Sequence, residues 1–215
     1  MRDTFHRELE RLDQDVVRMG ALVEAAIEGA ILALAEGDLE RAKRVQNGDD
    51  EIDDLFIDME KRAMAMLAQQ QPVAGDLRLI VTILRVVNDL ERAGDLAFNI
   101  ASVVRKDLDI VKLRKVSALV YELGHASRRL LSKALDVWSE KNLELAGQMD
   151  DLDDEIDELY ERLFRELFEL QNETTFDVAM NLVLVGRYFE RIADHAVNLA
   201  ERTRYFITGN EEHLG

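Results

Sequence analysis

Two pairs of carboxylate side chains, similar in their surroundings, are the residues of this chain best suited to chemistry. Glu91 and Asp95 lie four positions apart in one apolar run, and Glu190 and Asp194 have the same spacing in a second, similar run. Residues four apart share one face of an α-helix, so each pair would present its carboxylates side by side. Like charges at this spacing destabilise a helix by roughly 0.2–0.5 kcal/mol per pair. A bound cation would remove that repulsion.

A further acidic pair precedes each of these runs. Asp49 and Asp53 come before the first run, and Asp153 and Asp157 come before the second. Asp49 and Asp153 each interrupt a stripe of apolar residues that recur at spacings of three and four, the pattern of a helix face turned toward a core. A charged group in such a position is costly unless it is paired or coordinated.

The acidic pairs have two interpretations. One is a solvated helix face, which is the common role of a single pair. The other is a metal site, because neighbouring helices of a bundle bring such pairs together, and four converging carboxylates repel strongly without a cation between them. Oxygen ligands suit hard cations such as Fe³⁺, Mn²⁺, Mg²⁺ or Ca²⁺, whereas Zn²⁺ usually takes nitrogen or sulfur as well. The fourfold occurrence of the pair favours metal binding.

Residues beside the carboxylates have open or lesser roles. Asn99 and Asn198 lie one turn beyond the acidic pairs and are either further ligands or members of a polar strip. Arg92 and Arg191 are predicted to form salt bridges. His195 follows Asp194 but has no counterpart in the first run, which favours local packing for this residue.

The elements that position these residues are predicted to be long helices. Apolar spacings of three and four predict helices over about 4–36, 39–70, 77–106 and 113–140, and the segment around Pro72 is the clearest break. The second half repeats the first at an offset of 104 residues, which falls to 99 in the last helix. Such repetition indicates duplicated units. The predicted fold is all-α, with a three-helix bundle in residues 1–107 and another in residues 108–215.

Composition excludes several classes of function. Forty-four acidic against 27 basic residues give a net charge of −17, which opposes binding to nucleic acid or to anionic lipid. The chain has no Cys, so disulfides and thiolate metal sites are excluded. No apolar run is long enough to span a membrane, and the first residues do not form a signal segment. These features predict a cytoplasmic protein.

Enzyme motifs are scarce. No glycine-rich phosphate loop or nucleophile motif is present. A ferritin-like di-iron enzyme needs Glu-x-x-His on two helices, and the only match, Glu122 with His125, has no partner in the other half. The expectation is therefore no enzyme. The alternatives left open are a metal-dependent oxidase or phosphohydrolase built on the carboxylates and a helical scaffold with solvated acids.

The chain resembles the PhoU family of bacterial phosphate-signalling regulators. The resemblance rests on the tandem helical repeat, on the turn Gln-Pro-Val-Ala-Gly-Asp-Leu-Arg at 71–78, and on the strings Glu-Arg-Ala-Gly-Asp at 91–95 and Glu-Arg-Ile-Ala-Asp at 190–194. It covers the whole chain. It implies two similar three-helix bundles, each with a multinuclear metal cluster, with iron the expected metal and zinc, manganese, magnesium or calcium as alternatives. The implied ligands are Asp49, Asp53, Glu91 and Asp95 for one cluster and Asp153, Asp157, Glu190 and Asp194 for the other.

The same resemblance implies a regulatory function. Such a protein would restrain the phosphate-starvation response and high-affinity phosphate uptake when phosphate is plentiful. Its expected partners are the ATPase of the phosphate transporter and a membrane sensor histidine kinase, between which it would act as an adaptor. It is expected to be a homodimer.

Overall fold

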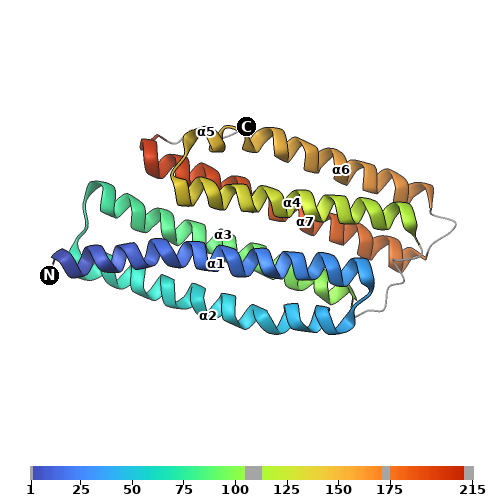
Figure 1. Cartoon of the computed structure of the whole chain (residues 1–215), viewed down its shortest axis with the longest axis horizontal. Helices are drawn as coiled ribbons and strands as arrows, with labels where there is room; N and C mark the ends of the chain where they lie inside the picture. Colours follow the sequence, from blue (N-terminus) through green and yellow to red (C-terminus); the bar gives the residue numbers. More distant parts are fainter. Residues whose placement is uncertain (1, 105–112, 171–174, 211–215) are drawn as a thin grey trace.

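The computed structural model of the chain describes residues 2–104, 113–170 and 175–210, and all secondary structure in these ranges is α-helical. Two groups of helices lie side by side along a common long axis (Figure 1). This arrangement confirms an all-α fold of two tandem helical bundles, and the predicted boundary at 107–108 lies outside the described residues. The helices are α1 (Arg2–Glu36), α2 (Leu39–Gln70), α3 (Ala74–Val104), α4 (Arg114–Glu140), α5 (Leu143–Ala146), α6 (Met149–Glu169) and α7 (Phe176–Thr208).

Local sequence sets most of the helix ends. Gly37 adopts a left-handed conformation with φ of 65°, and the Asp38 side chain then accepts a hydrogen bond of 2.9 Å from the backbone N–H of Arg41 to cap α2. Helix α3 begins at Ala74, three residues before the predicted start, so the connection that contains Pro72 comprises only residues 71–73. Asp76 therefore lies in the first turn of α3, where a negative charge is favourable.

The second repeat differs from the first in its middle helix. The repeat pattern predicts one continuous helix after Asn142, but the structure divides it into the short α5 and the longer α6. Asn142 caps α5 through its side chain, and Gly147 ends it with a backbone hydrogen bond of 3.2 Å to the carbonyl of Leu143. Glycine is a poor helix former, and Gly147 stands where the first repeat has Lys43.

The two bundles pack against each other through reciprocal contacts of α1 and α4. A Cβ atom on Gly124 would lie 2.8 Å from Ile31 Cγ1, and a Cβ atom on Gly20 would lie even closer to the side chain of Leu135. Gly124 and Leu135 are each 104 positions after Gly20 and Ile31, so the two contacts are the same contact made twice. Glycine at these points allows the antiparallel helices to approach, and the apolar residues of both repeats form one continuous core.

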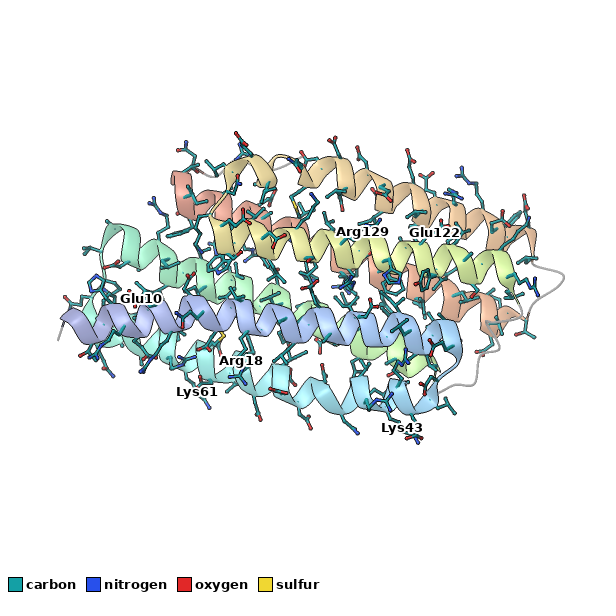
Figure 2. All side chains as sticks on the ribbon, viewed as in Figure 1. Glu10, Arg18, Lys43, Lys61, Glu122 and Arg129 are labelled. Atoms are coloured by element: carbon teal, nitrogen blue, oxygen red, sulfur yellow. The ribbon has the colours of Figure 1, made fainter. Side chains whose placement is uncertain are left out.

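Charged side chains cover the outer helix faces, as Figure 2 shows for six labelled residues. On these faces Arg18 of α1 pairs with Glu51 of α2 at 3.4 Å, and Arg129 of α4 pairs with Glu155 of α6 at 3.3 Å. Exposed pairs of this kind contribute little to stability. The opposite side of α2 packs on α3, and the opposite side of α6 packs on α7. Helices α3 and α7 carry the other acidic pairs.

Candidate metal centres

The four acidic residues of the first repeat lie on facing sides of α2 and α3. Gly94 of α3 makes the close approach of α2 possible, because a Cβ atom there would lie 3.3 Å from Ile52 and 3.8 Å from the carboxylate of Asp49. Asp49 and Asp53 are half-buried, as are Glu91 and Asp95. Each α2 carboxylate lies close enough to Asp95 for their charges to interact. The structure thus brings this predicted set together.

The second repeat has the same arrangement in a more open form. Asp153 interacts electrostatically with its own-helix neighbour Asp157 and with Asp194 of α7. Asp153 and Glu190 are half-buried, whereas Asp157 and Asp194 are exposed. Asp157 and Asp194 are therefore more exposed than Asp53 and Asp95 of the first repeat, whereas Asp153 and Glu190 are as buried as their counterparts.

Folding raises the pKa of several of these carboxyl groups. Burial is the main cause for Asp49, whose pKa rises to about 6, and repulsion by Asp53 and Asp95 adds to it. Burial and repulsion by Asp157 and Asp194 raise the pKa of Asp153 to about 6 in the same way. Burial also raises the pKa of Asp53, Asp157 and Glu91. Both sites therefore concentrate negative charge that the surrounding side chains only partly neutralise.

Arginines on α3 and α7 partly compensate this charge. Arg92 lies 3.1 Å from Asp95 and 3.3 Å from Glu91, which confirms its predicted salt bridges. In the second repeat Arg187, one turn before the acidic pair, contacts Glu190. Arg191 has no carboxylate within 4.0 Å among the residues that the structure describes, so the prediction for this residue is wrong.

The carboxylate oxygens of the two sites are ligands that suit a hard cation, although in this structure they do not surround a common metal position. Within residues 2–104, 113–170 and 175–210, no three acidic or histidine side chains are placed to hold one metal ion. The buried Oε2 atom of Glu91 makes no hydrogen bond, and its only described polar contact is the ion pair with Arg92. All eight predicted ligands donate oxygen, the preference of hard cations. Binding would require Glu91, Asp95 and Glu190 to turn away from their arginines.

A buried ionic cluster between the repeats was not predicted. Asp89 of α3 is 3% exposed, and its carboxylate lies 2.8 Å from Arg202 Nε and 3.2 Å from His195 Nδ1, both on α7. His195 therefore joins the two bundles, and the prediction of mere local packing is wrong. The available signal was a third acid, Asp89, in the apolar run that contains Glu91 and Asp95. The second repeat has Tyr188 at that position, so the repeat gave no support.

The Glu-x-x-His match also belongs to the contact between the bundles. His125 Nδ1 lies 3.7 Å from Glu28 of α1, and the ring packs edge-on against Tyr121 with centroids 4.3 Å apart. Glu122 is exposed and is not a partner of His125 in these interactions. This geometry gives no support to a di-iron site.

Comparison with known proteins agrees with the fold and with the duplication of the chain. The family model described as the PhoU domain matches residues 16–104 and again residues 120–203. These matches define a protein with two copies of a helical regulatory domain. The chain belongs to the PhoU family.

Individual relatives cover the whole chain. The phosphate-specific transport system accessory protein PhoU homolog of Clostridium acetobutylicum is 35% identical over 99% of this chain and 98% of its own length. The PhoU homolog 2 of Mycobacterium tuberculosis is 34% identical over 97% of this chain and 99% of its own length. These proteins carry names of accessory proteins and not of enzymes, in agreement with the prediction that this chain is not an enzyme.

Solved structures show the same architecture. The crystal structure of PhoU from Pseudomonas aeruginosa aligns over 96% of this chain and 100% of its own, with 31% sequence identity and a TM-score of 0.87. The phosphate transport system regulatory protein PhoU from Streptococcus pneumoniae covers 98% of this chain with all of its own length, at 28% identity and a TM-score of 0.86. No helix in the described part of this chain is long and apolar enough to cross a membrane.

Proposed function

We propose that this chain is a metal-binding regulatory adaptor of a phosphate transport system. In this role it restrains high-affinity phosphate uptake and the transcription of phosphate-starvation genes when phosphate is plentiful. It acts in the cytoplasm as a homodimer and links the transporter ATPase to a sensor histidine kinase. The relatives named as phosphate-specific transport accessory proteins support the coarser part of this role.

The duplicated carboxylate face is the observation that carries the metal-binding part of the proposal. In the first repeat the carboxylates of α2 face those of α3, and in the second repeat those of α6 face those of α7. Burial and this like-charge repulsion raise the pKa of Asp49 and of Asp153 to about 6. A multivalent cation would relieve the repulsion at each site. Iron in a multinuclear cluster is proposed, and manganese, magnesium, calcium or zinc are alternatives that the same ligands accommodate to different degrees.

The bound metal would supply positive charge that fixes neighbouring helices relative to each other. The chain's own residues would hold it through Asp49 and Asp53 on α2 with Glu91 and Asp95 on α3. The second site would use Asp153 and Asp157 on α6 with Glu190 and Asp194 on α7. In the metal-free protein Arg92 and Arg187 pair with carboxylates of the last helix of their repeat, and these ion pairs would have to open for those carboxylates to hold a metal.

Metal content tests the sites directly. The metal bound to purified wild-type protein is compared with that of the double variant Asp95→Ala with Asp194→Ala, and a matched variant, Asp50→Ala with Asp154→Ala, removes two neighbouring exposed acids. We expect loss of metal only in the first variant. Equal metal content in all three proteins would refute the assignment.

The regulatory role needs a separate test. Deletion of the gene is expected to raise transcription of phosphate-starvation genes in phosphate-rich medium, and re-expression of the wild-type chain is expected to restore repression. Transcription that stays low after deletion would refute the regulatory role whatever the metal content.

A further inference from the structure

Large apolar side chains gather at one end of α6 and α7 in the second repeat. Phe164 is 54% exposed and Phe168 65% on α6, while Phe176 is 81% exposed and Met180 42% on α7. Phe164 and Phe168 are four residues apart, as are Phe176 and Met180, so each pair forms a stripe on its helix. Monomers seldom leave large apolar side chains gathered in the open without a partner.

The two stripes lie on facing edges of neighbouring antiparallel helices. Asp157 of α6 interacts electrostatically with Arg187 of α7, which shows that these positions face each other. Phe164 and Phe168 follow Asp157 by seven and eleven residues, and Met180 and Phe176 precede Arg187 by seven and eleven residues. Both spacings return to the same helix face. The four side chains therefore form one surface, the α6–α7 apolar surface, at the end of the molecule where α6 ends and α7 begins (Figure 1).

Acidic residues outnumber basic ones around this surface. Helix α6 carries ten acidic and two basic residues in 21, a net charge of −8, whereas the longer α2 carries eight acidic and five basic residues, a net charge of −3. Seven of the ten acids lie in residues 150–158, before the apolar stripe. Beside the stripe itself the acids are Glu161, Glu166, Glu169 and Asp177, against the two bases Arg162 and Arg165. A partner for this surface must therefore combine apolar and basic side chains.

The aromatic character of the surface is specific to the second repeat. In the first repeat Glu60 takes the place of Phe164, and the exposed but smaller Met64 and Leu77 take the places of Phe168 and Phe176. The duplicated fold therefore does not require aromatic residues here. An anionic membrane or a second α6 would meet like charge across the contact, which is unfavourable.

We propose that the α6–α7 apolar surface binds an amphipathic helix of a partner protein, with apolar residues facing the phenylalanines and Lys or Arg facing the acidic residues of α6. This is the helix-in-groove mode of recognition, in which apolar anchors recur at spacings of three and four. The inference rests on the proposed adaptor function, which needs a protein partner. A dimer of this chain would use another surface.

A designed peptide tests the surface. The probe is a labelled helix of about 18 residues, which makes five turns, with Leu on one face and Lys on the other. It is titrated by fluorescence anisotropy into the full-length protein in a chelating buffer of physiological salt. The variant Phe168→Ser with Phe176→Ser is expected to weaken binding at least about tenfold, equivalent to 1.4 kcal/mol. The variant Met64→Ser with Val73→Ser, which changes two similarly exposed residues of the first repeat, is expected to leave binding unchanged.

Three further measurements decide between occupants. A peptide with Glu in place of Lys is expected to bind far more weakly, and Phe168→Lys is expected to repel the basic peptide in a protein that melts like wild type. Unchanged affinity in the phenylalanine variants, or equal binding of the two peptides, would overturn the proposal. The oligomeric state of wild type and of Phe168→Ser with Phe176→Ser is measured by analytical ultracentrifugation. A wild-type dimer that the variant abolishes would also overturn the proposal, because a second copy of the chain would then occupy the surface. If the peptide does not bind but deletion of the gene still raises transcription of phosphate-starvation genes, the proposed binding surface is refuted and the regulatory role is not.

Discussion

Replacing Asp49 with Asn tests whether the first acidic cluster is strained when no metal is bound. Asn has nearly the same shape as Asp but cannot ionise, so Asp49→Asn removes one negative charge from the cluster without opening a cavity. Burial and repulsion by Asp53 and Asp95 raise the pKa of Asp49 from 3.8 to about 6. We expect the variant to be more stable than wild type near pH 7.5 in the presence of a chelator.

The magnitude follows from the pKa shift. A pKa higher in the folded than in the unfolded chain means that the folded state binds the proton more tightly, so stability is greatest below the unfolded pKa and falls as the pH rises through the folded pKa. Each pKa unit corresponds to 1.36 kcal/mol, and a shift to about 6 gives an upper limit of about 3 kcal/mol. Asp49 is only half-buried, and solvent screening reduces the expected gain to roughly 1–2 kcal/mol.

Urea unfolding followed by circular dichroism measures the effect at two pH values. At pH 7.5 Asp49→Asn is expected to raise the free energy of unfolding, and at a pH of about 4, near the unfolded pKa, the gain is expected to vanish. The control is Asp50→Asn, which removes the same charge from the neighbouring exposed position. Asp153→Asn, with the same cause in the second repeat, is expected to repeat the result.

Two outcomes would refute this reasoning. Equal stabilisation by Asp49→Asn and Asp50→Asn would mean that total charge, and not the cluster, limits stability. Destabilisation by Asp49→Asn at pH 7.5 would mean that the ionised carboxylate makes a favourable interaction in the metal-free protein. In wild type, added metal is expected to raise stability, and Asp49→Asn is expected to reduce that increase.

Three substitutions elsewhere test the packing. Gly48→Ala is expected to stabilise the protein by about 0.5–1 kcal/mol, because a Cβ atom there meets nothing within 4 Å and Ala is the better helix former. Gly124→Ala is expected to destabilise it by about 1–3 kcal/mol, because the added Cβ would press on Ile31 and force the bundles apart. Asp89→Ala is expected to cost about 3 kcal/mol by leaving Arg202 without its buried partner. Urea unfolding at pH 7.5 measures all three, and a stable Asp89→Ala protein or a neutral Gly124→Ala substitution would contradict the described contacts.

The repeat explains why so much of the fold could be predicted. Helix periodicity placed most helices within a few residues of their observed ends, and the break around Pro72 was evident from its composition. Periodicity also showed that Asp49 and Asp153 lie in apolar stripes, and both carboxylates are half-buried next to a neighbouring helix. Each of these signals occurs twice, so local noise in one copy is corrected by the other.

Features that occur only once were missed for the same reason. The cluster of Asp89, His195 and Arg202 depends on how the two bundles pack, and helix periodicity says nothing about which faces meet. The division of the second repeat at Gly147 depends on one residue that weakens a helix whose counterpart remains continuous. A repeat-based prediction transfers the first copy to the second and so overlooks such differences.

The departures from repeat symmetry identify where the second bundle differs in its surface. The charge of −8 on α6, the exposed Phe164 and Phe168, and the more solvated carboxylates Asp157 and Asp194 all lie on the α6–α7 side. The apolar core and the α1–α4 contact, in contrast, keep the symmetry closely. Core positions are constrained by packing within the chain, whereas exposed positions are not. Apart from the buried cluster of Asp89 and the break at Gly147, the differences gather on one exposed face, as the proposed partner contact at α6 and α7 predicts.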